Sequence, residues 1–179
     1  MPIKENTLIL DGYTLTLEEL MKAGTDLSIK VEIDDKNWPK IRDCRDLVEK
    51  WASEEQCIYG VNTSCGGLVD YLLPRERDND FQKNLVRSVT TQVGEPFEDT
   101  LVRKFMIARA NSLCRGFSGI KEKNLRIYLD MINNHVFPVI PRKGSLGTSG
   151  DLGPLGCIAS VAFGEWKAKY NGKVMPGKE

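Results

Sequence analysis

Apolar residues recur every three or four positions along most of this chain, which is the spacing of helices that bury one face. Five such stripes comprise Trp38, Ile41, Cys44, Leu47, Val48 and Trp51; Phe81, Leu85, Val89 and Val93; Leu101, Phe105, Ala108 and Leu113; Leu125, Leu129, Ile132 and Val136; and Leu152, Leu155, Ile158, Ala162 and Trp166. A shorter helix is predicted after Thr16, since Glu19 stands at capping-box spacing from it. The chain is therefore predicted to be mainly α-helical.

Glycine and proline residues mark where helices stop and loops begin. Gly94 and Pro96 end the second stripe. Residues 56–61 are too short for a helix and are predicted to be extended, while Asn171-Gly172 favours a tight turn. Alternation of apolar and polar positions is scarce, so only a few short strands are expected. The helices are too few and too apolar to close a core of their own, and a larger bundle is expected to cover them.

Composition narrows the class of protein. The 179 residues are 41% hydrophobic and 28% charged, as in globular domains. Lys+Arg and Asp+Glu number 25 each, so no bulk charge attracts nucleic acid or an anionic membrane. No apolar run approaches the roughly 18 residues of a membrane span, and the N-terminus lacks the pattern of a secretion signal. The five cysteines contain no C-x-x-C pair, which favours reduced thiols and a cytoplasmic location.

The most unusual segment is 144–155, which reads GSLGTSGDLGPL and stands directly before the last predicted helix. Three interpretations compete. The segment can be an ordinary capping loop in which Ser149 or Asp151 accepts the first amide protons of the helix. It can be a glycine-rich phosphate cradle, although it lacks the lysine and the glycine order of the phosphate-binding motifs. It can also be a loop that cyclises on itself.

Self-cyclisation needs residue types that this loop supplies. The amide nitrogen of Gly150 can attack the carbonyl carbon of Thr148 and close a five-membered ring, and the carbonyl oxygen leaves as a first water molecule. Glycine suits the attacking position because no Cβ obstructs the approach. Ser149 then loses its hydroxyl as water, and its Cβ becomes an exocyclic methylidene. Thr148 contributes only its carbonyl. The product is a methylidene-imidazolone (MIO), an electrophile near the positive end of a helix dipole.

This segment resembles the MIO loop of the histidine, phenylalanine and tyrosine ammonia-lyases and of the related aminomutases. The usual tripeptide there is Ala-Ser-Gly; Thr148 departs from it without changing the cyclising atoms, and bacterial phenylalanine aminomutases are similar in carrying Thr-Ser-Gly. The resemblance runs from about Leu8 to the end of the chain. It implies the N-terminal part of the fumarase/aspartase-like ammonia-lyase helical fold, an MIO formed from Thr148-Ser149-Gly150, and no metal or external cofactor.

A second segment, 59–67, reads YGVNTSCGG and is similar to the family's other N-terminal signature, Tyr-Gly-x-Thr-Thr-Gly-x-Gly. Taken alone, Tyr59 is typical of a half-buried aromatic residue. The resemblance implies instead that Tyr59 is the general base on a mobile lid and that Gly66 belongs to the substrate-binding site. A phenolate is basic enough to remove a weakly acidic Cβ proton if positive groups or helix dipoles ease its ionisation. The wording of residues 62–67 resembles the aminomutase branch more than the lyases.

The same resemblance implies that the helix around 81–89 determines which aromatic ring is bound. Ser88 and Val89 fall where the family contacts the ring, and Leu152 is assigned to the same site. Tyrosine lyases tend to carry histidine at the first of these positions and histidine lyases at the second. This chain has neither, and its His135 lies at an unrelated helix end. A small residue and an apolar one suit an unsubstituted phenyl ring, so phenylalanine is the predicted substrate.

The resemblance implies a 2,3-aminomutase that converts L-phenylalanine to β-phenylalanine, or an ammonia-lyase that forms an arylacrylate. Residues 1–179 are expected to be the N-terminal MIO-containing domain, with the MIO loop at about 144–152, while the carboxylate-binding arginine and the central bundle lie downstream. The terminal residues VMPGKE close no helix, which indicates a fragment or a split-gene product. The chain alone is expected to be inactive. Activity is expected to need a homotetramer of the longer chain or a complementing C-terminal polypeptide. A non-catalytic assembly module is the remaining alternative.

Overall fold

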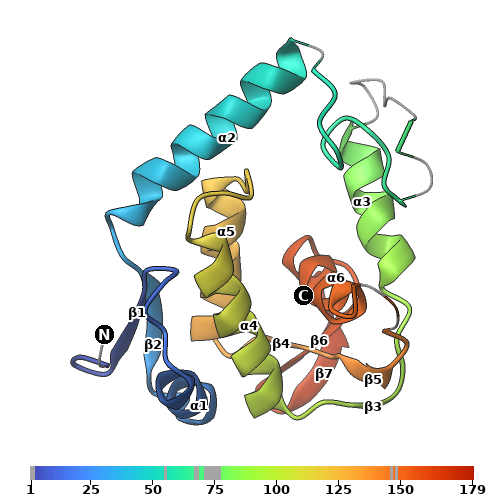
Figure 1. The fold of residues 1–179 in the computed structure, drawn as a ribbon. Coiled ribbons are helices and arrows are strands. Elements are labelled where there is room, and N and C mark those ends of the chain that lie inside the picture. The colour runs from blue at the N-terminus through green and yellow to red at the C-terminus, as the bar shows by residue number, and fades with distance from the viewer. Residues whose placement is uncertain (1–2, 55, 67–68, 71–77, 146, 148) are drawn as a thin grey trace.

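The computed structural model of the chain describes residues 3–54, 56–66, 69–70, 78–145, 147 and 149–179. These residues form a mainly helical structure with short strands, as predicted (Figure 1). The helices in this part of the chain are α1 (Leu17–Thr25), α2 (Asn37–Ser53), α3 (Asp78–Val89), α4 (Asp99–Leu113), α5 (Glu122–Asn133) and α6 (Leu152–Ala162). Each of the five apolar stripes therefore corresponds to a helix.

The strands of the described residues form two pairs and one three-stranded sheet. They are β1 (Thr7–Leu10) with β2 (Lys30–Ile33), β3 (Val93–Pro96) with β5 (Pro141–Lys143), and β4 (Phe137–Pro138), β6 (Lys167–Tyr170) and β7 (Lys173–Pro176). The first pair is parallel and the others are antiparallel. The predicted tight turn joins β6 to β7, with Asn171 and Gly172 at φ values of 48° and 75°.

The predicted start of the first helix is confirmed. The Thr16 hydroxyl accepts the backbone N–H of Glu19 at 3.2 Å, and the Glu19 carboxylate accepts the backbone N–H of Thr16 at 3.0 Å. The two bonds satisfy donors at the start of the helix, and such a cap stabilises it by about 1 kcal/mol. α1 is thereby fixed where it packs against α4.

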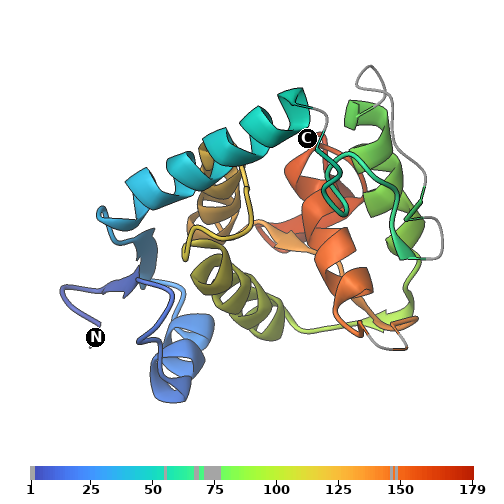
Figure 2. The ribbon, with the colours of Figure 1, turned by 45° about the horizontal axis from the view of Figure 1, so that its top comes forward.

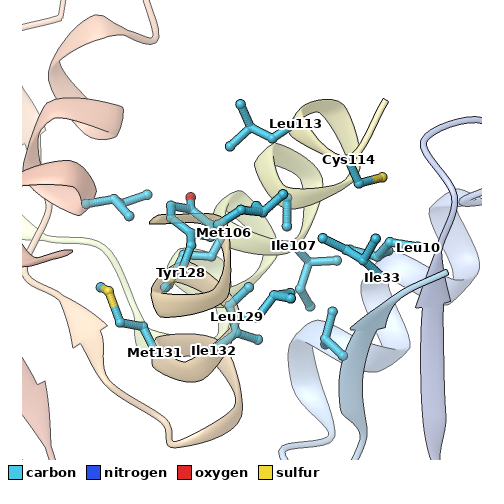
Figure 3. Packing of buried hydrophobic residues seen from close by; sticks show 14 of the residues in the cluster. Leu10, Ile33, Met106, Ile107, Leu113, Cys114, Tyr128, Leu129, Met131 and Ile132 are labelled. Atoms are coloured by element: carbon cyan, nitrogen blue, oxygen red, sulfur yellow. The ribbon is translucent and has the colours of Figure 1, made fainter. Parts of the chain in front are cut away.

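The largest part of the core lies between α4, α5 and the β1–β2 pair (Figure 3). Met106 and Ile107 of α4, Ile132 of α5 and Leu10 of β1 are all fully buried there. Burying each such side chain contributes about 1.5–3 kcal/mol relative to leaving it in water. These contacts make α4 the central helix of the described structure.

α4 buries more of its surface than the predicted stripe, and not all of that stripe is buried. Val102 and Ala110 are buried, whereas Phe105 of the predicted stripe is only partly buried and Ala108 is exposed. The reason is that α4 packs against both α1 and α5, so its apolar residues are not confined to a single stripe. The prediction of the helix is correct, and the prediction of its buried face is correct at Leu113 and wrong at Ala108.

Three predicted stripes also extend too far. Val93 lies in β3 and is 62% exposed, because the chain has by then begun its pairing with β5. Val136 follows α5, which ends where His135 adopts a φ of 58°. Trp166 follows α6, which ends at a left-handed Gly164 (φ 84°), a common helix terminator. The helices are therefore shorter than the periodicity predicts.

α2 lies along one edge of the molecule and leads into the segment that follows residue 55 (Figures 1 and 2). Arg42 of α2 joins Glu122 of α5 at 2.8 Å, and Arg45 donates to the carbonyl of Gly119 at 3.1 Å. Arg42, followed by Arg126, holds the pKa of the Glu122 carboxyl below its usual range. Among the described helices, none combines the length and the apolar character that a membrane crossing requires.

Candidate active site

The loop between β5 and α6 contains the predicted MIO residues. Leu146 and Thr148 lie outside the described residues, so the structure gives no account of the first residue of the tripeptide. The hydroxyl of Ser145 donates to the carbonyl oxygen of Gly150. This hydrogen bond joins the start of the loop to its end.

Ser149 and Gly150 are both exposed in this loop. A Cβ built on Gly150 would meet no atom within 4 Å, and the same holds for Gly147. Neither glycine is therefore required by packing against a neighbour. The space around the two residues leaves the loop free to accommodate a ring formed from its own backbone.

The side chains of Ser149 and Asp151 do not cap α6, so the capping interpretation of the loop is not supported. Asp151 is the N-cap of α6, yet its side chain makes no capping hydrogen bond. The Asp151 carboxylate instead accepts a long hydrogen bond from the Ser149 hydroxyl at 3.4 Å, and the backbone N–H of Leu152 donates to the carbonyl of Ser149 at 3.3 Å. The first turn of α6 thus points its amide dipoles toward the loop, where they favour negative charge.

The described residues fit an MIO. Ser149 carries the hydroxyl that must leave, it is exposed, and its oxygen has a carboxylate as neighbour. Gly150 offers an amide nitrogen with no side chain and with open space around its Cα. The helix start behind them adds a favourable field for an electrophile that receives negative charge.

The predicted lid segment follows α2 and lies beside α3 (Figures 1 and 2). Residues 59–62 form a turn and residues 56–58 have no regular secondary structure, so the predicted extended segment is not found at 59–61. The reason is a set of local hydrogen bonds: the Asn62 side-chain oxygen accepts the N–H of Ile58 at 2.8 Å, and its amide nitrogen donates to the carbonyl of Gln56 at 2.7 Å. These bonds replace the strand pairing that an extended segment would need.

Tyr59 is 64% exposed, not half-buried. Its phenol oxygen accepts the backbone N–H of Gly66 at 3.0 Å, which links two of the predicted site residues. Gln82 of α3 donates to the carbonyl of Gly60 at 3.3 Å, so the segment is also tied to α3. Between the described residues of this segment and those of the 144–151 loop, the structure shows no hydrogen bond.

Ser88 and Val89 occupy the last turn of α3, and Leu152 is the first residue of α6. The Ser88 hydroxyl donates to the carbonyl of Leu85 at 2.7 Å within its own helix. Val89 is half-buried because its side chain lies against Gly156 of α6, where an added Cβ would come within 2.8 Å of it. Leu152 is 51% exposed. Two helices therefore carry these three residues, and α3 and α6 pack directly against each other.

An ion pair fastens the same two helices together. The Arg87 guanidinium, next to Ser88, binds the Glu165 carboxylate just beyond α6 through two nitrogens. Arg87 lowers the pKa of the Glu165 carboxyl, and Glu165 in turn raises the pKa of Arg87. Both side chains are exposed, so the pair fixes geometry more than it adds stability.

Sequence reasoning missed one residue at this site. Gln92, just after α3, is only 5% exposed and contacts both ends of the MIO loop. A glutamine after a helix ordinarily indicates a solvent-facing position, so no pattern in the sequence marks it. Its burial is visible only once α3 and α6 are packed together.

Comparison with known proteins identifies the family. A model of the aromatic amino acid lyases matches residues 15–179. This chain belongs to the aromatic amino acid lyase family. The predicted family and its helical ammonia-lyase fold are therefore confirmed.

Individual members of the aromatic amino acid lyase family show the same likeness. A histidine ammonia-lyase of Alkaliphilus oremlandii is 39% identical over 173 residues, which cover 96% of this chain and 34% of that protein. A tyrosine 2,3-aminomutase of Chondromyces crocatus is 40% identical over 144 residues, or 80% of this chain and 27% of that protein. The solved structure of a phenylalanine aminomutase from Pantoea agglomerans is 41% identical with a TM-score of 0.89, covering 96% of this chain and 33% of that one. The chain spans about a third of the length of these relatives.

Proposed function

We propose that this chain supplies the MIO loop, the general base and part of the ring pocket of a phenylalanine 2,3-aminomutase. The substrate is L-phenylalanine and the product is β-phenylalanine. The observation that supports a mutase is the side chain of Asn62, which ties the lid segment at two points to the residues just before it, Gln56 and Ile58.

By the resemblance given above, Asn62 stands where the signature Tyr-Gly-x-Thr-Thr-Gly-x-Gly has threonine. Its amide presents a separate acceptor and donor, which hold the N–H of Ile58 and the carbonyl of Gln56 together. A threonine hydroxyl has one oxygen for both roles. A lid held at two points opens more slowly, and a mutase needs the released amine to stay in the site until it adds to Cβ.

The chain's own residues have distinct roles in this reaction. Thr148-Ser149-Gly150 hold the MIO, which supplies an electrophilic alkene for the substrate amine. Tyr59 removes the Cβ proton as a phenolate, and the N–H of Gly66, which donates to the Tyr59 oxygen at 3.0 Å, stabilises the negative charge on that oxygen. The lid excludes water while the proton is transferred.

The residues at the end of α3 support phenylalanine as the substrate. The Ser88 hydroxyl already donates to the carbonyl of Leu85, and Val89 is apolar. Neither offers a free donor to a phenol hydroxyl or an imidazole ring, and a buried polar group without a partner is costly. Together with the exposed apolar side chain of Leu152, they suit a plain phenyl ring.

The remaining part of the active assembly comes, we propose, from a homotetramer of a longer chain or from a complementing C-terminal polypeptide. An apolar cavity of about 310 Å³ lies between α4, α5 and α6 and is lined by side chains that include Ile127, Leu155 and Phe163. Ile127 and Phe163 are 41% and 37% exposed. Such a surface is suited to burial under further helices, and the relatives are about three times as long as the matched region.

A product assay tests the proposed reaction. The active assembly is incubated with L-phenylalanine, and β-phenylalanine and cinnamate are separated by chromatography. β-Phenylalanine is the expected main product, and Asn62→Thr is expected to shift the ratio toward cinnamate without changing the mass of the MIO loop. Cinnamate and ammonia as the only products would remove the mutase assignment.

The alternative function is an ammonia-lyase acting on the same or another aromatic amino acid. The relative from Alkaliphilus oremlandii, named a histidine ammonia-lyase and 39% identical over 96% of this chain, supports it. Supplying L-histidine and L-tyrosine in parallel with L-phenylalanine separates these substrates. A non-catalytic assembly module is distinguished by intact mass, since it would retain an unmodified tripeptide and turn over none of the three.

A further inference from the structure

Gln92 lies between the two ends of the MIO loop. At the start of the loop, a Cβ built on Gly144 would come within 3.1 Å of the Gln92 Cα. At the end of the loop, a Cβ built on Gly153 would lie 1.4 Å from the Gln92 side-chain nitrogen, which is a position that the amide already fills. Gly153 must therefore be glycine as long as Gln92 keeps this conformation.

The Gln92 amide is fixed on its other side as well. Its oxygen accepts the thiol hydrogen of Cys157 at 3.2 Å, and its nitrogen donates weakly to the carbonyl of Val89 at 3.4 Å. Cys157 is fully buried in α6, and burial raises the pKa of its thiol to about 11, so the thiol stays protonated and remains a donor at neutral pH. Gln92 thus joins the end of α3 to the second turn of α6.

The backbone around Gln92 adds a further constraint. β3 begins at the next residue, Val93, which pairs with Lys143 of β5, and β5 leads directly into Gly144. The residue that touches Gly153 through its side chain therefore also fixes Gly144 through its backbone. The eight intervening residues, 145–152, have both ends held by one buried residue.

Cyclisation requires the Gly150 nitrogen to approach the Thr148 carbonyl carbon, which an unrestrained loop does rarely. Fixing the ends of a chain lowers the entropy lost when two of its atoms are brought together, and small errors of position reduce the rate strongly. We infer that Gln92 is a positioning residue for MIO formation and that it acts by holding the two ends of the loop. The lack of a side chain at Gly153 leaves the space that the Gln92 amide occupies. This inference rests on the proposed function and assigns Gln92 no contact with substrate.

The test measures how fast the MIO forms in the active assembly. Wild type, Gln92→Ala and Gln92→Met are expressed in a short pulse, and intact mass then gives the fraction of chains lighter by two water molecules at successive times. Gln92→Met keeps the length of the side chain without its amide, so it decides the question if Gln92→Ala does not fold. Gln82→Leu is the matched control, because Gln82 is an exposed glutamine that contacts the lid segment and not the loop.

Both Gln92 variants are expected to form the MIO on the order of tenfold to a hundredfold more slowly than wild type, with Gln92→Met the less affected. Their kcat per mature site is expected to match wild type, because Gln92 has no assigned contact with substrate, whereas a general distortion of the site would lower kcat per mature site as well. Gly153→Ala is expected to slow formation similarly. Formation at the wild-type rate in both Gln92 variants would overturn the inference. A wild-type assembly that is active with an unmodified loop would instead overturn the proposed function.

Discussion

Gly116 is a position where a single methyl group should move a helix. It follows α4 at a φ of 73° and is packed against the first turn of α2. A Cβ there would lie 3.0 Å from the carbonyl carbon of Lys40 and 3.2 Å from the amide nitrogen of Ile41. These are backbone atoms, which cannot rotate aside as the end of a side chain does. Gly116→Ala must therefore displace α2 or strain the chain after α4.

Two costs add in this variant. An alanine at positive φ costs about 1 kcal/mol relative to glycine. Forcing an extra carbon into a packed site costs about 1–3 kcal/mol more, so the free energy of unfolding should fall by about 2–4 kcal/mol. Gly172 offers a matched control, because its φ is 75° and no atom lies within 4 Å of its Cβ position. Gly172→Ala should therefore cost only the first amount, about 1 kcal/mol.

Urea unfolding followed by far-UV circular dichroism measures the difference between the two variants. Gly116→Ala is expected to be less stable than Gly172→Ala by about 1–3 kcal/mol, with the same dependence on urea concentration. Equal losses in the two variants would refute the close approach of α2 to the end of α4. Since α2 leads into the segment that carries Tyr59, the same displacement should also increase proteolysis after α2.

Three further changes test the site and the fold. Tyr59→Phe should lower kcat of the active assembly by about a hundredfold or more while leaving the MIO mass unchanged, and an unaltered kcat would exclude Tyr59 as the base. Arg103→Met removes the guanidinium donor from two buried backbone carbonyls, those of Ile29 and Ile132, and should lower the free energy of unfolding by about 2–4 kcal/mol, which an unshifted urea midpoint would contradict. Because Arg42 lowers the folded-state pKa of Glu122, the pair should stabilise the fold fully above the unfolded pKa of about 4.3 and lose this effect as the pH falls through the lower folded pKa. Glu122→Gln should flatten that acid limb of the stability curve, and superimposable curves would show that the pair contributes nothing.

The sequence predicts the local features of this fold well and the tertiary ones poorly. The capping box at Thr16 and the turn at Gly172 depend on neighbouring residues alone, and both occur as predicted. The buried face of α4 depends on two packing partners, so a single stripe could not identify it. β1 is only four residues long, and its parallel partner is separated from it by α1. Alternation over so few residues carries too little information to predict a strand.

The candidate site divides in the same way. Ser149 and Gly150 could be identified because cyclisation restricts which residue types can stand side by side. The contact between the Tyr59 oxygen and the Gly66 amide could not be predicted, since it depends on how the lid segment turns. Gln92 could not be found either, because its burial results from the packing of α3 on α6. The sequence thus identifies the residues that would react, while the residues that hold them in place become visible only in the folded structure.

The most direct test of the proposed chemistry is the mass of the MIO loop in an assembly that converts phenylalanine. Intact mass and peptide mapping of residues 144–155 are expected to show a loss of two water molecules located at Thr148-Ser149-Gly150. Ser149→Ala should lack the methylidene and the activity while keeping the fold. An assembly that turned over phenylalanine with this tripeptide at its unmodified mass would contradict the account.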